Sequence, residues 1–235
     1  MLADADLATI AELMSSHRAT LLLALIGGST LSASELSARA GISPSLASAH
    51  LSKLLDGGLL AVHQHGRQRH YRLASPHVAE VIEAMLTLAP HRRAASLRDA
   101  NHGHAIRHAR TCYDHLAGTL GVTLTDALCH QHLIEPGDNH YRLTPAGEAR
   151  LAELGLDVDA LRARRRAFAR PCLDWTERRP HLAGALGAGI ARRMLDLDWV
   201  KPVPGTRALR VTDTGRRRLR DELAINLAPS PPVGK

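Results

Sequence analysis

Hydrophobic positions near the start of the chain recur at helical spacing. They predict a helix over residues 7–25 that ends in a glycine pair. Ser32 and Glu35 have the spacing of a capping box, which predicts the start of a short helix over residues 33–40. Gly41 is expected to end that helix because glycine readily adopts the left-handed conformation found there.

A second helix and a hairpin are predicted next. The helix over residues 44–55 begins with a proline at a tolerated first-turn position, and its apolar side chains are expected to be buried: Leu46, Leu51 and Leu54. Residues 59–62 and 70–73 predict paired strands around a polar turn, and Pro76 opens an apolar helix. This order of elements predicts a winged helix-turn-helix.

Specific residues in this region resemble a known family. The run from Ser48 to Leu59 follows the pattern Ser-x-His-Leu-x2-Leu-x3-Gly-Leu, and residues 71–73 read Tyr-Arg-Leu at the end of the wing. Together they resemble the recognition helix and basic wing of ArsR-type (ArsR/SmtB-like) bacterial repressors, over roughly residues 5–90. The resemblance implies a homodimer on a double-stranded DNA operator. Its dimer seam would comprise Leu7, Ile10, Leu13, Val78, Val81, Ile82 and Met85.

The second helix of this motif and the wing carry the expected DNA contacts. Helix residues there reach base edges in the major groove, and basic residues at a wing tip contact phosphates or enter the minor groove. The candidates are Ser43, Ser45, Ser48, Ala49, His50, Lys53, Arg67 and Arg69.

The second half of the chain repeats itself. Residues 112–121 return as 172–174 and 181–187, and residues 142–151 match 210–219. We interpret this as a duplication. Each copy is expected to contain two helices, a two-stranded hairpin and a closing helix, with the repeated glycines allowing close helix approach. Thr144 and Thr212 occupy expected N-cap positions.

These patterns predict a mainly α fold with small β-hairpins (α+β), in which a winged helix-turn-helix precedes a duplicated winged-helix-like C-terminal domain. The expected boundaries are 1–90 for DNA binding and dimerisation, 91–108 for a basic linker, 109–225 for a sensor or scaffold domain with repeats at about 109–155 and 169–223, and 226–235 for a tail.

All three cysteines lie in the second half. Cys112 and His115 have the spacing of one helix face. The effector or redox candidates are Cys112, Asp114, His115, Cys172, Asp174 and His181. They are compatible with a thiophilic metal ion at Cys112 and Cys172, a disulfide, a small-molecule pocket or simple packing. The cysteine pair that forms the best-known metal site of ArsR-type proteins has no counterpart at residues 33–37.

Composition adds a preference for polyanions. The formal net charge is +7, and nearly all of the basic residues are arginines, which suit phosphates and guanine edges. Few cysteines, no long apolar run and an acidic start predict a cytoplasmic protein with reduced thiols. The common nucleotide, nucleophile and metalloprotease motifs are missing, so we expect no enzyme.

The sequence therefore predicts a sequence-specific transcriptional regulator, a repressor by resemblance. It is expected to respond to a thiol or redox signal, a metal or a small molecule at its C-terminal domain. The alternative is a non-specific architectural DNA-binding protein without an effector.

Overall fold

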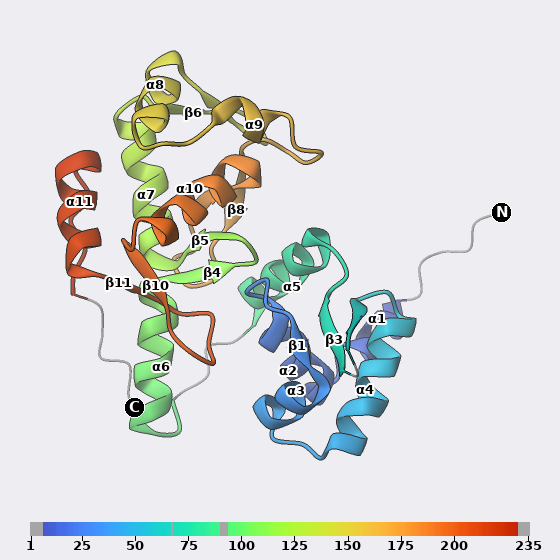
Figure 1. Cartoon of the computed structure of the whole chain (residues 1–235). Helices are drawn as coiled ribbons and strands as arrows, with labels where there is room; N and C mark the ends of the chain where they lie inside the picture. Colours follow the sequence, from blue (N-terminus) through green and yellow to red (C-terminus); the bar gives the residue numbers. More distant parts are fainter. Residues whose placement is uncertain (1–6, 67, 90–93, 230–235) are drawn as a thin grey trace. The chain divides into compact units, whose positions relative to one another are not determined.

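The computed structural model describes residues 7–66, 68–89 and 94–229, and the chain forms two compact units, Met1–Ile82 and Glu83–Lys235 (Figure 1). One helix, α5 (Pro76–Leu88), crosses the boundary between them. No helix in the described part of the chain combines the length and the apolar character needed to cross a membrane.

The first unit is the predicted winged helix-turn-helix. Its elements are α1 (Leu7–Leu13), α2 (Ser16–Leu25), β1 (Leu31–Ser32), α3 (Ala33–Ala40), α4 (Pro44–Asp56), β2 (Leu60–His65), β3 (Gln68–Leu73) and the first part of α5. The strands form an antiparallel sheet in the order β1-β3-β2. The wing is the hairpin β2–β3, in which Leu60 pairs with Leu73 at the base and His65 pairs with Gln68 near the turn.

Local signals in the sequence account for the helix ends in this unit. The Glu35 backbone N–H donates to Ser32 Oγ at 3.3 Å, and the Ser32 N–H donates to Glu35 Oε2 at 2.8 Å, so the predicted capping box is confirmed. Gly41 ends α3 with a φ of +65°. Because α3 and α4 each begin and end where the sequence predicts, the helix-turn-helix is specified largely by its caps.

Two expectations for this unit are wrong in detail. The helix predicted over residues 7–25 is broken into α1 and α2, because Ser15 takes an extended conformation before α2. Leu46 is 39% exposed rather than buried. The inward face of α4 is formed by Ala47, Leu51 and Leu54 at helical spacing, and Leu46 lies one residue to the side of that stripe.

The second unit repeats one order of elements. It comprises α6 (Leu97–His108), β4 (Arg110–Cys112), β5 (His115–Ala117), α7 (Gly118–His130), β6 (Ile134–Pro136), β7 (Tyr141–Leu143), α8 (Pro145–Glu153), α9 (Val158–Arg162), β8 (Arg170–Leu173), β9 (Pro180–Ala183), α10 (Gly184–Asp196), β10 (Val200–Pro202), β11 (Leu209–Val211) and α11 (Asp213–Leu223). Hairpin, helix, hairpin and helix follow one another from β4 to α8 and again from β8 to α11. Part of the segment expected to be a linker forms α6, whose Ala105 and Ile106 are buried.

The start of each copy differs from the prediction. Residues 110–117 form a β-hairpin, not a helix, and Cys112 therefore faces His115 as a cross-strand pair. A two-residue turn joins the strands, with Tyr113 at a φ of +59° followed by Asp114, a common turn residue. The second copy has the same pair, Cys172 opposite His181, across a longer loop.

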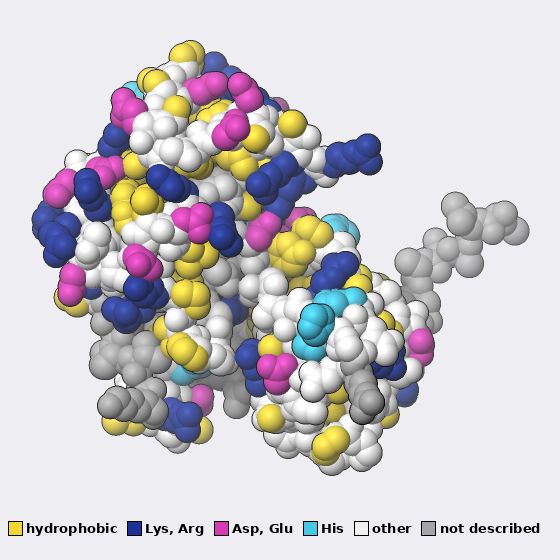
Figure 2. Space-filling view, viewed as in Figure 1, with side chains coloured by type: hydrophobic (Ala, Val, Ile, Leu, Met, Phe, Trp, Pro, Cys, Tyr) yellow, Lys and Arg dark blue, Asp and Glu magenta, His cyan; other side chains and the backbone are white. Residues whose placement is uncertain are grey.

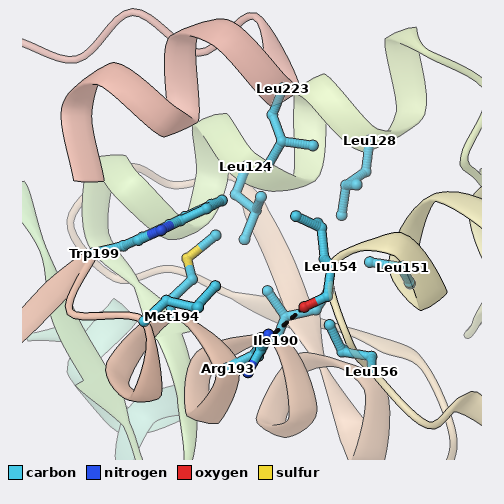
Figure 3. A pocket seen from close by; sticks show the side chains of 11 residues that line it. Leu124, Leu128, Leu151, Leu154, Leu156, Ile190, Arg193, Met194, Trp199 and Leu223 are labelled. Carbon is cyan, nitrogen blue, oxygen red and sulfur yellow. Dashed lines mark hydrogen bonds between the residues drawn. The ribbon is translucent and has the colours of Figure 1, made fainter. Parts of the chain in front are cut away.

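The two copies interlock around one core. Helix α7 packs on β9 and helix α10 packs on β5, so each long helix covers a hairpin from the other copy. Their apolar faces belong to one cluster, which includes Leu120, Leu124, Leu128, Leu186, Ile190 and Met194. A cavity of about 20 Å³ remains inside this cluster, lined mainly by leucines together with Met194 and Trp199 (Figure 3).

The helices that close the copies, α8 and α11, begin at matching threonine caps, each followed by a glycine with no room for a side chain. Thr144 Oγ1 accepts from the Gly147 N–H at 3.0 Å, and Thr212 Oγ1 accepts from the Gly215 N–H at 2.9 Å, which confirms both predicted N-caps. A Cβ at Gly215 would lie 2.0 Å from the Trp199 carbonyl oxygen. These helices therefore rest directly on the backbone of the preceding segment.

We expect Gly215→Ala to lower the free energy of unfolding by about 1–3 kcal/mol, because the methyl group must displace packed backbone. The measurement is urea unfolding followed by circular dichroism. The control is Gly103→Ala on α6, where a Cβ meets nothing within 4 Å. That variant is expected to match or exceed the wild type by about 0.5–1 kcal/mol, since alanine favours helix. Equal stability of both variants would contradict the packing described here.

Candidate functional site

Helix α4 presents a row of small and polar side chains to solvent. Ser45, Ser48, Ala49 and Lys53 are all exposed on it, as expected for a helix that enters a groove. Ser43, also exposed, is the N-cap of α4: its hydroxyl accepts from the Leu46 N–H at 3.3 Å and lies 3.2 Å from the Ser45 hydroxyl.

The wing strand β3 has two exposed arginines in its described part, Arg69 and Arg72. Arg69, the predicted contact, has its guanidinium 5.7 Å from the centre of the Tyr71 ring. Arg67 lies outside the described residues. Sequence reasoning did not single out Gln64, His65 and Gln68, which are also exposed on the wing. Their only signal was the polar run between the two strands, and Figure 2 shows histidine side chains gathered on the surface of this unit.

His50 differs from the other α4 candidates because it is half-buried against α2. Its Nδ1 lies 3.4 Å from Arg18 Nη1, and its ring centre lies 5.5 Å from that of His17. Burial lowers the pKa of His50, and the Arg18 charge lowers it further. His50 is therefore less accessible than Ser45, Ser48 and Ala49, and its contact with a base stays a prediction.

Most arginines of the second unit have acidic neighbours. Figure 2 shows acidic and basic side chains interspersed over the face of this unit in view. Ion pairs join Arg142 with Glu135, Arg162 with Glu148, Arg179 with Asp126, Arg192 with Asp196 and Arg218 with Glu222. Many arginines of this unit are therefore paired with carboxylates, and their number does not by itself mark a DNA-binding face.

The hairpins of the second unit bring four ligand-type side chains together, and we call this set the Cys/His cluster: Cys112, His115, Cys172 and His181. All four are buried, and one ligand atom from each lies within 4.8 Å of the others. The two Sγ atoms are 3.9 Å apart, and the two Nε2 atoms are 3.1 Å apart. Each copy supplies one cysteine and one histidine, and this donor set is able to hold a metal ion.

Asp174 holds one side of the cluster in place. The side chain is completely buried, and Oδ2 lies 3.3 Å from His181 Nδ1. The same oxygen accepts from Arg110 Nη2 at 2.9 Å and from the Gly118 N–H at the start of α7 at 2.7 Å. The other oxygen accepts from the backbone and the hydroxyl of Thr176 at 2.9 and 2.6 Å. Asp174 thus joins the loop at residues 174–179 to the start of α7, and its carboxylate lies beside the His181 ring without hydrogen-bond geometry.

Asp114 plays the matching part for the other histidine. Its Oδ1 lies 3.4 Å from His115 Nδ1, and its carboxylate forms an ion pair with Arg166. Unlike Asp174, this side chain is 32% exposed. Both histidines therefore point Nδ1 at a carboxylate and Nε2 at the centre of the cluster.

Arg110 is a buried residue whose importance sequence reasoning missed. It is 0% exposed and pairs with Asp174, and its Nη1 donates to the Ile106 carbonyl at 3.2 Å. The Trp175 ring covers the guanidinium, with its centre 5.0 Å from Arg110 Cζ. The only sequence signal was the repeated Arg-x-Cys at 110–112 and 170–172. Trp175 therefore packs within the unit.

The cluster strongly perturbs its titratable groups. Burial raises the pKa of Asp174, but the contacts with His181, Arg110, Thr176 and Gly118 outweigh it and hold that pKa well below its usual range. Burial lowers the pKa of His181, and the neighbouring Asp174 and Cys172 more than offset this, so the pKa is raised.

Cys112 and Cys172 share one hydrogen bond, and their pKa values are shifted in opposite directions. Their contact lowers the pKa of Cys172, which His115 and His181 lower further against the effect of burial. The same contact, together with burial, raises the pKa of Cys112. The contact between the two sulfurs therefore favours one negative charge on the pair. Cys129 lies elsewhere, half-buried against the main core, and burial raises its pKa.

The repeated glycines make room for the cluster. A Cβ at Gly121 would lie 2.4 Å from the Leu116 carbonyl oxygen and 3.5 Å from His181 Cβ. A Cβ at Gly187 would lie 2.3 Å from the Leu182 carbonyl oxygen and 3.4 Å from His115 Cβ. These glycines let each helix approach its own hairpin and the histidine of the other copy, and this explains the repeated motif better than the helix-to-helix contact that we expected.

Comparisons with known proteins identify the family. Residues 13–63 match the family described as "Helix-turn-helix domain". YdfF of Bacillus subtilis (strain 168), an uncharacterized HTH-type transcriptional regulator, is 41% identical over 223 residues, which span 94% of this chain and 99% of that protein.

Similar solved structures include reduced HlyU from Vibrio cholerae, with 28% identity over 36% of this chain and 90% of that one, and a TM-score of 0.32. The transcriptional repressor BigR from Xylella fastidiosa has 25% identity over 37% of this chain and 88% of that one, and a TM-score of 0.33. Because the likeness to YdfF extends over nearly the whole of both chains, the protein belongs to the HTH-type transcriptional regulators, as a member with an ArsR-type winged helix-turn-helix and an extended C-terminal region.

Proposed function

We propose that the protein is a sequence-specific DNA-binding repressor that acts as a homodimer and whose affinity for its operator is set at the Cys/His cluster by a thiophilic metal ion. The observation that carries this proposal is the presence of two separate features in one chain. One is an exposed α4 in a winged helix-turn-helix, and the other is a buried four-ligand cluster in the second unit.

The DNA-binding part rests on exposure and chemistry. Ser45 and Ser48 offer hydroxyl groups, and Ala49 offers a methyl group to a thymine. Lys53, one turn further along α4, is placed for a phosphate, and Arg69 is a candidate for the same role on the wing. The repressor role follows from the resemblance to ArsR-type proteins.

The homodimer rests on apolar side chains that remain exposed. Ile10 on α1 and Val81 and Met85 on α5 are 47%, 45% and 40% exposed. Ile82, expected at the same seam, is buried in the core instead. Exposed apolar positions on helices are typical of surfaces that a partner covers, and a two-fold partner would supply the second α4 for an operator with two half-sites.

The signal has a continuous route toward the DNA-binding unit along the chain. The Thr111 N–H, beside Cys112, donates to the Arg207 carbonyl at 3.0 Å. The Arg207 side chain forms an ion pair with the buried Glu83 of α5. Since residues 76–82 of the same helix belong to the first unit, a change at the cluster is transmitted to α5 by bonded and hydrogen-bonded groups.

The test is fluorescence anisotropy of the full chain with DNA from upstream of its own gene and with a scrambled duplex of equal length. We expect a preference for the upstream DNA of at least about a thousandfold at physiological salt. Equal affinity for both duplexes would overturn the proposal and favour the architectural alternative. The salt dependence of both dissociation constants separates the phosphate contacts, which the two duplexes share, from the sequence-specific contacts.

A further inference from the structure

We infer that the Cys/His cluster is a closed tetrahedral zinc site in which Asp114 and Asp174 position the two imidazoles. The inference that zinc binds is drawn only from the geometry of the second unit. The effect of zinc on operator affinity rests on the proposed function.

The like pairs of ligand atoms have the spacing of a tetrahedron. With Zn–S near 2.3 Å and Zn–N near 2.0–2.1 Å, tetrahedral angles place two sulfurs about 3.8 Å apart and two nitrogens about 3.3 Å apart. The Sγ atoms of Cys112 and Cys172 are 3.9 Å apart, and the Nε2 atoms of His115 and His181 are 3.1 Å apart. Sulfur and nitrogen would lie about 3.5 Å apart around the ion. All four ligand atoms lie within 4.8 Å of one another, so binding draws the cysteines and histidines together by up to about 1 Å.

The carboxylates fix which nitrogen of each ring faces the centre. An ionised carboxylate only accepts hydrogen bonds, so the contact of His115 Nδ1 with Asp114 favours a proton on that nitrogen. His181 Nδ1 lies 3.3 Å from Asp174 Oδ2 without hydrogen-bond geometry, and the negative charge there favours the same tautomer. The Nε2 atoms then direct lone pairs at each other across 3.1 Å unless a cation or a further proton lies between them. Histidine ligands of zinc characteristically have this carboxylate behind the ring.

The donor set selects the class of ion. Two thiolates and two imidazoles suit zinc and similar thiophilic ions, whereas calcium and magnesium require oxygen ligands. Four protein ligands fill a tetrahedron, and all four side chains are buried, so no position remains for water or substrate. The site therefore serves structure or sensing and not hydrolysis.

The ion would also join the two copies. Each hairpin contributes one cysteine and one histidine, and each hairpin lies under the long helix of the other copy. A bound ion closes this arrangement from the inside, whereas its loss leaves two buried thiols and two facing histidines. Binding or loss of the ion therefore changes how tightly the hairpins β4–β5 and β8–β9 are held together.

The test begins with the full chain purified under reducing conditions, stripped with a chelator and then titrated with zinc or cobalt. We expect one zinc per chain by elemental analysis. The cobalt form is expected to show the intense visible bands of a tetrahedral site and a thiolate-to-cobalt charge-transfer band. Cys172→Ser should lose most of the affinity and weaken the charge-transfer band. Cys129→Ser is the matched control and should behave as the wild type.

A second variant tests the positioning role without removing a ligand. Asp114 is partly exposed, so Asp114→Asn is expected to fold normally. It should bind zinc about 10–100-fold more weakly while keeping the tetrahedral cobalt spectrum. An unchanged zinc affinity would overturn the role assigned to Asp114.

Three results would overturn the zinc site itself. They are no stoichiometric metal, an octahedral cobalt spectrum, or a Cys112–Cys172 disulfide that remains after reduction and excludes metal. None of these measurements uses DNA, so failure of the zinc site is distinguishable from failure of operator binding. If zinc binds but operator affinity ignores it, the site is structural and only the regulatory part of the proposed function falls.

Discussion

Asp174→Asn is expected to lower the free energy of unfolding of the metal-free protein by about 3–5 kcal/mol, the usual cost of removing one partner from a buried ion pair. Asp174 and Arg110 are both completely buried, and asparagine would leave the guanidinium charge without a counter-ion. The amide also presents two donors where the carboxylate accepts from the Gly118 N–H and from Thr176. Loss of these contacts would remove the hydrogen bonds that hold both the start of α7 and the loop at residues 174–179.

The measurement is urea unfolding of the metal-free chain, with the Trp175 and Trp199 fluorescence of the second unit as the probe. Asp114→Asn is the matched control, because its carboxylate also contacts a histidine and an arginine but is partly exposed. Exposed ion pairs contribute about 0–1 kcal/mol, so this variant should remain close to the wild type. If the two variants lost equal stability, Asp174 would not be the buried anchor described here.

Ala49→Asp is expected to abolish the preference for operator DNA, a loss of at least about a thousandfold in specific affinity. Ala49 is exposed on α4 between Ser48 and the half-buried His50, so the new side chain points outward without disturbing the core. A carboxylate there would face the phosphates and the acceptor-rich edge of the major groove. Thermal unfolding should be almost unchanged.

Its control is Ala152→Asp, which makes the same substitution at an exposed helical position in the second unit. Anisotropy with the upstream and scrambled duplexes should show wild-type binding for this variant. If Ala49→Asp also bound the operator as the wild type does, α4 would not be the helix that reads DNA.

The first unit could be predicted from the sequence because its signals are local. Ser32 with Glu35, Gly41 and Pro44 each fix a helix end through their own backbone chemistry. Leucines at helical spacing then identify the buried face of α4, apart from Leu46. The break between α1 and α2 was missed because only Ser15, an unremarkable residue in a helical pattern, marks it.

The second unit was harder because its structure depends on contacts between distant residues. The spacing of Cys112 and His115 suits either a helix or a two-residue hairpin turn, and only pairing across the turn brings their side chains together. The repeat singled out both cysteines, both histidines and both aspartates, and the structure places them close together. It contained nothing to show that Arg110 would pair with Asp174 or that Gly121 would lie against His181, since both contacts join different copies.

His50 shows the converse problem. Its position in the family pattern predicts a base contact, whereas packing against Arg18 and His17 leaves the side chain half-buried. Which face of a helix is occupied by a neighbouring helix depends on tertiary packing, and the pattern of one helix does not contain that information.

Operator affinity of the full chain with and without zinc tests the central claim most directly. Anisotropy with the upstream duplex should give dissociation constants that differ by about 5–150-fold between the zinc-loaded and the stripped protein, the range of typical coupling free energies. Cys172→Ser should bind the operator with the same affinity with and without zinc. Cys129→Ser should show the same zinc-dependent difference as the wild type. Equal operator affinities of the zinc-loaded and stripped wild type would contradict a regulator controlled from the Cys/His cluster.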